Sequence, residues 1–136
     1  PLDLIQPYRL EMGTTMNNSK GKNLYEFWGT KISEQLKKDI NNNKSKYIVN
    51  CASDEYFKVI DFPTLNVPVI KPIFKDLKNG VPKVISFFAK RARGMMSKYI
   101  IKNRVQSIDD LHGFNDNGYE FQPDQSENHE LVYIRG

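Results

Sequence analysis

The segment from Asn50 to Lys58 (Asn-Cys-Ala-Ser-Asp-Glu-Tyr-Phe-Lys) gathers a thiol, a hydroxyl, two carboxylates, a phenol and an amine. It follows a short β-rich run, and ligand sites in open sheets lie at the ends of strands. Ser53 at the start of a helix could hold a phosphate with help from Lys58 or Lys90. The simpler alternative is a capped helix that carries solvated charges.

The same residues give little support to catalysis. A nucleophilic Cys51 needs a nearby base, and His112 and His129 are both distant in the sequence, so we expect a structural thiol. The pairs Asp54-Glu55 and Asp109-Asp110 would point about 100° apart on a helix, which is typical of caps rather than of an acid/base dyad. The sequence also has no glycine-rich phosphate loop and no His-x-x-x-His pair. We therefore predict no catalytic residue, no metal site and no cofactor, and the sequence favours a protein that is not an enzyme.

Positive charge is concentrated in one part of the chain. Between Leu77 and Ile108 there is no acidic residue, and there are eight basic ones: Lys78, Lys83, Lys90, Arg91, Arg93, Lys98, Lys102 and Arg104. Because the whole chain has a net charge of +4, the remainder has 12 basic and 16 acidic residues, a net charge of −4. A localised basic element is typical of a polyanion site.

A helix over residues 90–104 would sort these cations onto separate sides. At about 100° per residue, Arg91, Lys98 and Lys102 fall within about 40° of one another, whereas Lys90 and Arg93 fall in a different sector. A third side, predicted to face the core, is formed by Ala92, Met96, Tyr99 and Ile100. Solvated surface charge is the alternative, but a helix that is merely soluble usually mixes Lys and Arg with Glu and Asp.

Length and composition predict either one domain over residues 1–136 or part of a larger one, since 136 residues with 39% hydrophobic side chains can form a packed core. The only cysteine, Cys51, cannot form an internal disulfide. No apolar run approaches ~18 residues and no leader is visible, so we expect no membrane association and a cytoplasmic location. The sequence begins at Pro1 and reads like the interior of a folded chain, so we expect a piece of a longer protein.

The first half of the chain should position the basic helix with one helix and several strands. Two prolines allow only a turn or a short helix in Pro1–Tyr8. Asn23 and Glu26 form a capping box for a helix from Leu24 to about Ile40, whose Phe27 and Trp28 should be buried. The run Tyr47–Cys51 reads as a short strand.

The middle of the chain predicts two more strands. Residues 67–74 read as a strand that Pro68 and Pro72 would make either an edge strand or an irregular one. Asn79-Gly80 predicts a turn. Residues 84–89 read as a strand that is apolar on both faces and therefore central, with Phe87 and Phe88 in the core rather than stacked on nucleic-acid bases.

The end of the chain predicts a short helix that begins in Ser107–Asp110, followed by an antiparallel pair of strands over residues 118–121 and 130–135. Strands and helices mix without a regular βαβ rhythm, so the expected class is α+β with a mixed or antiparallel sheet packed by helices.

Five segments, in this order, resemble the C-terminal half of the YaaA family. They are PLDLIQPYRLEMG at residues 1–13, LYEFWG at 24–29, NCASDEYFK at 50–58, ISFFAKRARGMM at 85–96 and GFNDNGY at 113–119. Together they span nearly the whole chain, which makes the resemblance more specific than any single motif.

The resemblance implies a cytoplasmic bacterial protein of the peroxide stress response that limits intracellular iron and binds DNA. It also implies an α/β fold around a positively charged cleft, to which the N-terminal half contributes a helix-hairpin-helix element that precedes and enters the block at Pro1–Met12. By motif position, the residues expected at the cleft are Arg9, Lys58, Lys90, Arg91, Arg93 and Lys98, with Lys102 on the same helix and with Ser53 and Tyr56 as polar lining.

Two functions remain open at this stage. The first is a protein that binds double-stranded DNA with little sequence specificity, through phosphate contacts that the absent N-terminal half helps to form. The alternative is an enzyme or binding protein for a small phosphorylated or nucleotide-like ligand in the same cleft. Salt-dependent affinity for long duplexes would favour the first, and tight binding of one small phosphate compound would favour the second.

Overall fold

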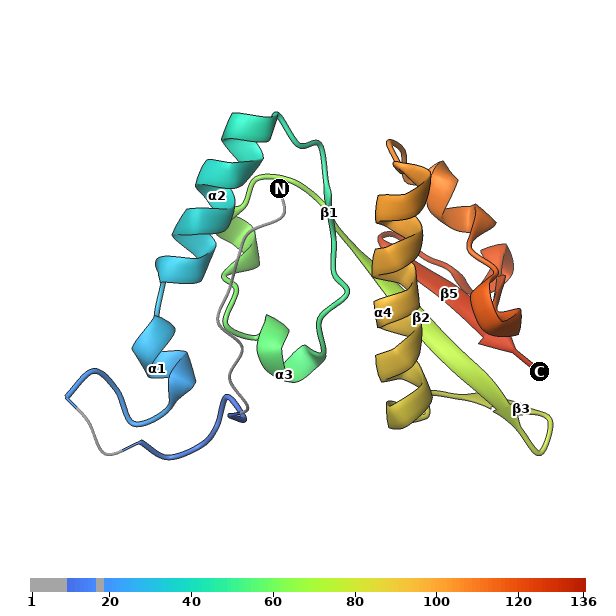
Figure 1. Ribbon diagram of the computed structural model, residues 1–136, viewed down its shortest axis with the longest axis horizontal. Coiled ribbons are helices and arrows are strands. Elements are labelled where there is room, and N and C mark those ends of the chain that lie inside the picture. Colours follow the sequence, from blue (N-terminus) through green and yellow to red (C-terminus); the bar gives the residue numbers. More distant parts are fainter. Residues whose placement is uncertain (1–9, 17–18) are drawn as a thin grey trace.

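The computed structural model describes residues 10–16 and 19–136. Figure 1 shows two groups of elements joined by a long strand: helices that belong to the first half of the chain lie on one side, and a long helix lies against a sheet on the other. The turn expected in Pro1–Tyr8 lies outside the described residues, as does Arg9.

A mixed sheet forms the framework. Its order is β1-β2-β5-β4, with β3 paired to β2 outside this path. The pairs β1–β2 and β2–β5 are parallel, whereas β2–β3 and β4–β5 are antiparallel. The strands are β1 (Ile48–Val49), β2 (Val69–Lys78), β3 (Val81–Lys83), β4 (Glu120–Phe121) and β5 (Glu130–Arg135). Helices pack against this sheet, which confirms the α+β class and the antiparallel closing pair.

Strand β2 is central, so its predicted place at a sheet edge is wrong. On the β5 side the Lys71 amide donates to the carbonyl of His129 at 2.7 Å, and on the β1 side the Asn50 amide donates to the carbonyl of Ile70 at 2.7 Å. Alternation along the strand therefore directs the nitrogen of Pro72 toward the β1 side. Strand β1 has already ended there, because its last pair is Val49 with Ile70. Pro72 thus removes no hydrogen bond from the sheet.

The central strand predicted over residues 84–89 is also wrong. Strand β3 ends at Lys83, and residues 86–89 of the predicted strand form the first turn of helix α4 (Ser86–Asn103). A short apolar run does not distinguish a strand from a buried helix, and the burial of Ala89 and Met96 follows helical spacing instead. The predicted turn is confirmed, since Asn79 and Gly80 both have positive φ (54° and 75°) between β2 and β3.

The helix predicted over residues 24–40 is two helices, α1 (Leu24–Trp28) and α2 (Lys31–Asn43). Gly29 ends α1 with a φ of 48°, a conformation that glycine adopts without strain. Half of the predicted capping box is confirmed, because the Asn23 side chain accepts a hydrogen bond from the Glu26 amide at 3.0 Å. The Glu26 carboxylate instead accepts from the Lys22 amide at 2.8 Å.

The predicted surroundings of the α1 aromatics are wrong. Phe27 and Trp28 are half-buried rather than buried. Trp28 borders a pocket beside Ile48 and Val49 of β1, and it does not face residues 84–89. The break at Gly29 turns α1 relative to α2, so the predicted continuous apolar side of residues 24–40 does not form.

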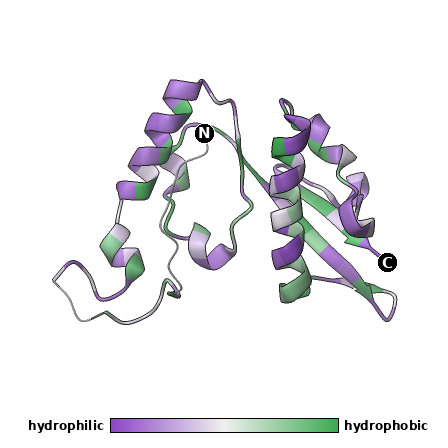
Figure 2. Ribbon diagram, in the orientation of Figure 1, coloured by the Kyte–Doolittle hydropathy of each residue, from purple (hydrophilic) through white to green (hydrophobic). Residues whose placement is uncertain are grey.

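An aromatic core lies between the sheet and α4. The Phe74 ring stacks on Tyr133 at 5.3 Å and meets Phe114 and Tyr119 edge-on at 5.7 and 5.2 Å. Figure 2 shows the alternating hydropathy of β2, and every second side chain from Ile70 to Asp76 is buried. Ala89, Ala92 and Met96 of α4 cover this side of the sheet and leave the other sides of the helix to solvent.

The segment after α4 closes the core. The Ser107 hydroxyl accepts a hydrogen bond from the Asp110 amide at 3.2 Å, and the Asp110 carboxylate accepts from the Ser107 amide at 2.9 Å, which confirms the predicted capping. These bonds start the short helix η2 (Asp109–Gly113), which buries Leu111 and leads to the buried Phe114.

Candidate nucleic-acid interface

Helix α4 presents five cations outside the core. Lys90, Arg91, Lys98 and Lys102 are exposed and Arg93 is half-buried. Among the described residues, none of the five forms an ion pair with a carboxylate. Unpaired cations on one helix keep their charge available to an external anion.

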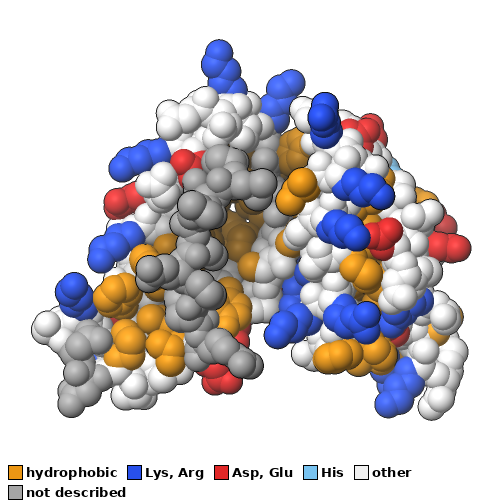
Figure 3. Space-filling model, in the orientation of Figure 1, with side chains coloured by type: hydrophobic (Ala, Val, Ile, Leu, Met, Phe, Trp, Pro, Cys, Tyr) orange, Lys and Arg blue, Asp and Glu red, His pale blue; other side chains and the backbone are white. Residues whose placement is uncertain are grey.

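Figure 3 shows Lys and Arg side chains on both halves of the molecule, closer together over the α4 half, and a hollow between the two halves. Ala92 and Met96 fix the rotation of α4 because they are fully buried. The exposed arc of the helix consequently holds Arg91, Lys98 and Lys102 on one flank. The other flank turns toward α3 (Asp54–Phe57).

That second flank lines a pocket of 530 Å³ against α3 (Asp54–Phe57). Lys90 and Arg93 from α4 meet Ser53 and Tyr56 from the start and middle of α3. The remaining lining residues are Glu11, Cys51, Glu55, Ser86, Gly94 and Ser97. The pocket therefore has both signs of charge, although the Glu55 carboxylate is already engaged by the Met12 amide at 2.9 Å.

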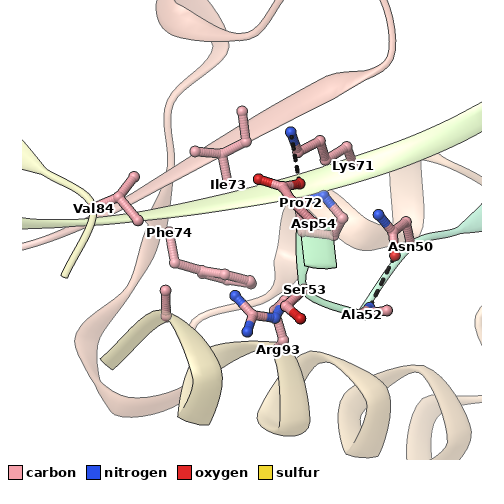
Figure 4. Close-up of a pocket in the computed structure, with 11 residues that line it drawn as sticks. Asn50, Ala52, Ser53, Asp54, Lys71, Pro72, Ile73, Phe74, Val84 and Arg93 are labelled. Carbon is pink, nitrogen blue, oxygen red and sulfur yellow. Dashed lines mark hydrogen bonds and ion pairs between the residues drawn. The ribbon is translucent and has the colours of Figure 1, made fainter. Parts of the chain in front are cut away.

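A smaller pocket of 240 Å³ adjoins it and shares Ser53 and Arg93. Figure 4 shows Arg93 extending from α4 toward Ser53, with Lys71 of β2 on the opposite side. The Lys71 ammonium group pairs with the Asp54 carboxylate at 3.4 Å. Arg93 therefore stands between two adjoining cavities and could contact an anion in either one.

Cys51 lies at the inner wall of the larger pocket. Burial raises the pKa of its thiol, while a hydrogen bond with Ser97 and the charge of Arg93 act in the opposite direction. The net effect leaves a protonated thiol at neutral pH, which is a poor nucleophile. This environment agrees with the structural role expected for Cys51.

Replacing Cys51 with serine should leave nucleic-acid binding and survival under peroxide nearly unchanged, because the thiol contributes packing rather than chemistry. Binding is measured by gel shift and survival by growth after a peroxide pulse. Complete loss of protection in cells, with the protein still folded by circular dichroism, would contradict this prediction and indicate a redox sensor.

The paired carboxylates have structural partners. Backbone hydrogen bonds from Gln106 and Ser107 hold the pKa of Asp110 below its usual range. Asp54 pairs with Lys71, and Glu55 accepts from the Met12 amide. The Asp109 carboxylate is exposed and lies 3.9 Å from His112 Nδ1. These adjacent acids thus serve as caps, pair partners, backbone acceptors or solvated charges, and neither pair forms an acid/base dyad.

The structure brings together four of the predicted site residues, since Ser53, Tyr56, Lys90 and Arg93 line one pocket. Arg91, Lys98 and Lys102 lie on the neighbouring flank of α4. Lys58 lies apart, in a shallow depression with Asp54, Phe57, Phe62 and Lys71. Arg9 is outside the described residues.

The lining residues that were not among the predicted site residues include Ser86, Ser97 and Lys71. Ser86 and Ser97 lie on the same side of α4 as Lys90 and Arg93. Helical spacing would have predicted both serines at the pocket if the predicted helix had begun at residue 86 and not at residue 90. Lys71 gave no such signal, because it is a single cation on a strand whose approach to α3 depends on the β1–β2 pairing.

Residues 10–16 and 19–136 contain neither a membrane-spanning helix nor a metal-binding cluster. No helix there is long and apolar enough to cross a bilayer. No group of three or more His, Cys, Asp and Glu side chains in the same residues could hold a metal ion.

Known proteins resemble this chain over most of its length. A family model described as peroxide stress protein YaaA matches residues 1–125. A UPF0246 protein of Idiomarina loihiensis is 51% identical over 135 residues, which cover 99% of this chain and 52% of that protein. The chain thus spans about half the length of the curated relative that it matches.

Proposed function

Because this chain belongs to the family of the peroxide stress protein YaaA, we propose that it supplies a phosphate-binding face to a DNA-binding protein of the peroxide stress response. The face consists of the exposed cations of α4, with the pocket beside α3 at its border. The assignment of this chain to the C-terminal half of the family stays a prediction, as does a cytoplasmic location.

The observation that carries the proposal is the set of unpaired cations on α4. Arg91, Lys98 and Lys102 project from one flank of a helix that the core holds in a fixed rotation. The stretch from residue 78 to residue 107 has no acidic residue that could neutralise them. Lys and Arg that face phosphates release condensed counterions, and this release supplies most of the affinity of sequence-independent binding.

Phosphate contact explains why little sequence specificity is expected. Sequence readout requires side chains that reach base edges in a groove, whereas contacts to phosphate fix only position. Limitation of intracellular iron, which the family resemblance implies, remains part of the proposal, and we assign no iron ligand among the described residues. In this view DNA binding limits peroxide damage directly.

The test is the salt dependence of DNA affinity in the full-length gene product. Each phosphate contact contributes about −0.9 to the slope of log affinity against log salt on duplex DNA. Arg91→Gln, Lys98→Gln and Lys102→Gln should each reduce the slope by about one and weaken different sequences by a similar factor.

Lys90→Gln and Arg93→Gln provide the matched comparison, since these cations belong to the flank that faces α3. If the salt slope changes only for Lys90→Gln and Arg93→Gln, the DNA phosphates contact the pocket beside α3 and not the flank formed by Arg91, Lys98 and Lys102. An unchanged slope for all five variants would refute α4 as the phosphate-binding element.

A second candidate function rests on the pocket itself. Its 530 Å³ could hold a small phosphorylated or nucleotide-like ligand between Arg93, Lys90 and Ser53. Calorimetry with inorganic phosphate and with nucleoside monophosphates would test it, with Arg93→Gln as the control. Tight binding of one such compound that Arg93→Gln abolishes, together with no binding of long duplexes, would favour this second function over the first.

A further inference from the structure

Strand β2 has an open stretch along one edge. Strand β5 occupies the other edge as far as Asp76. Asp76 pairs with β3 as well, so β3 lies on the same side of β2 as β1. On that side β1 ends with the pair of Val49 and Ile70, and β3 ends with the pair of Lys83 and Asp76. No strand among the described residues therefore covers residues 72–75 on this edge.

Alternation along β2 decides which backbone groups face the open stretch. Because the Ile70 carbonyl accepts from the β1 side, the carbonyl of Pro72 and the amide of Phe74 point the same way. In a parallel ladder, one residue of a neighbouring strand would donate to the Pro72 carbonyl and accept from the Phe74 amide. These two groups thus offer an acceptor and a donor side by side.

The two chain segments that could pair with this stretch leave β2 before they reach it. Ala52 would continue β1, but its amide donates to the Asn50 side chain at 2.9 Å. Ile85 would continue β3, but its carbonyl accepts from the Ala89 amide at 2.8 Å, where α4 begins. The smaller pocket, of 240 Å³, occupies the space between the two segments.

Asn50 adds a donor to the same pocket. Its side chain is buried, since the residue is 4% exposed, and the bond to Ala52 fixes the position of the side-chain oxygen. Figure 4 shows the Asn50 nitrogen turned toward β2. This NH₂ group donates to none of the described residues. Buried polar groups are normally hydrogen-bonded, so an unpaired amide that lines a pocket indicates a ligand with an acceptor.

The two adjoining pockets differ in size and character. The smaller is below the range of about 300–1,000 Å³ that whole small-molecule ligands occupy, so it has room for one ring system. Apolar side chains form its walls: Ala52, Pro72, Phe74, Val84 and Ala89. The larger, of 530 Å³, shares Ser53 and Arg93 with it and adds the cation of Lys90. A ligand with a flat ring and an anionic group fits both together.

We propose that the smaller pocket binds the base of an adenine nucleotide whose phosphate lies in the larger pocket. The base donates from N6 to the Pro72 carbonyl, N1 accepts from the Phe74 amide, and N7 accepts from the Asn50 NH₂ group. Arg93 and Lys90 contact the phosphate. The proposal rests on the second candidate function above, which supplies the phosphate site, and it adds the identity of the base.

The order of donors and acceptors along β2 selects adenine. The protein presents a donor from Asn50, an acceptor from Pro72 and a donor from Phe74. Adenine has the complementary order, because N7 accepts, the N6 amino group donates and N1 accepts. Guanine has the acceptor O6 where adenine has its amino group, so two acceptors would meet at Pro72. The pyrimidines have no N7 to accept from Asn50.

The test is calorimetry with the full-length protein and a series of ligands that differ at single atoms. AMP should bind about 10- to 100-fold more tightly than GMP and than ribose 5-phosphate, which lacks the base. Purine riboside 5′-monophosphate lacks the amino group, and 7-deaza-AMP lacks N7. Each should lose about 10-fold or more relative to AMP, because each leaves one buried group of the protein unpaired.

Asn50→Asp locates the base in the smaller pocket. The aspartate keeps an oxygen that can accept from the Ala52 amide, but it replaces the NH₂ donor with a second acceptor. AMP should therefore lose its advantage over 7-deaza-AMP in this variant, whereas ribose 5-phosphate should bind both proteins through the cations of the larger pocket. Circular dichroism checks that the variant is folded.

Other results would overturn the proposal. Equal affinities for AMP, GMP and ribose 5-phosphate would leave the phosphate site in place and exclude a base in the smaller pocket. Equal affinities for AMP and 7-deaza-AMP in the unaltered protein would exclude the contact from Asn50 and with it the order of contacts along β2. If none of these compounds bound, the second candidate function would fail, and this proposal would fail with it.

Discussion

Replacing Arg91, Lys98 and Lys102 together with glutamine should lower the affinity of the full-length protein for duplex DNA by about 100-fold at ~0.15 M salt. Each phosphate contact makes affinity vary with salt to the power of about −0.9, so each is worth roughly fivefold at that salt concentration. Glutamine keeps the helix propensity and most of the length of the basic side chains, so the fold should survive. Fluorescence anisotropy across a salt series measures both the affinity and the slope.

A matched control removes the same charge elsewhere. Lys31, Lys37 and Lys38 are exposed on α2, which lies in the other half of the molecule from α4. Their replacement by glutamine should leave the salt slope nearly unchanged. If this control loses as much affinity as the α4 triple variant, binding follows net charge, and α4 has no special part in it.

Local signals in the sequence predicted local structure well. The Asn23 cap, the Asn79-Gly80 turn and the Ser107–Asp110 cap each depend on contacts within three or four residues, and all three are present. The helical spacing of Ala92 and Met96 likewise predicted the buried side of α4, and with it the exposure of the cations on the other sides.

Errors arose where distant pairing decides the outcome. Pro72 indicated an edge strand, yet β2 pairs with β5, whose residues lie about sixty positions further along the chain, and no local signal reports that pairing. The apolar run at residues 84–89 has no period long enough to separate strand from helix. Its helical start leaves Phe87 and Phe88 exposed, which reverses the prediction that both rings lie in the core.

The candidate site also has one part that local sequence signals predict and one part that depends on distant contacts. The cations of one flank follow from helical geometry alone, because a single element positions them. The pocket needs two elements, and the meeting of Ser53 and Tyr56 with Lys90 and Arg93 depends on how α3 lies against α4. Residue spacing could not predict the contact between α3 and α4, and only the family resemblance predicted these four residues at one cleft.

Replacing Asp76 with asparagine should destabilise the fold by about 3–5 kcal/mol, because it leaves a buried cation without its counter-ion. The Asp76 side chain is 8% exposed and the Arg135 side chain 19% exposed, and both Nε and Nη2 of Arg135 donate to the same Asp76 oxygen. The Tyr119 hydroxyl donates to the other oxygen at 3.0 Å. The Asp76 carboxylate thus binds both the Arg135 guanidinium and the Tyr119 hydroxyl at the edge of the core.

The same network connects the core to the surface of α4. The Arg135 guanidinium lies over the rings of Phe88 and Tyr119, each at 4.8 Å, so the Asp76 carboxylate fixes the cation that holds Phe88. Loss of the pair should therefore loosen the first turn of α4 as well as lower global stability. Urea denaturation measures the stability, and hydrogen exchange at residues 86–90 measures the local loosening.

Two further measurements identify the cause of the loss. Burial and the neighbouring Asp76 carboxylate raise the pKa of Tyr119 to about 12, so Asp76→Asn should lower that pKa in an ultraviolet titration. The double variant Asp76→Asn, Arg135→Met should recover much of the lost stability, because it removes the uncompensated charge and leaves an apolar side chain over the two rings. An Asp76→Asn variant that unfolds at the same urea concentration as the original protein would show that the pair contributes nothing, and that aromatic packing alone holds α4 against the sheet.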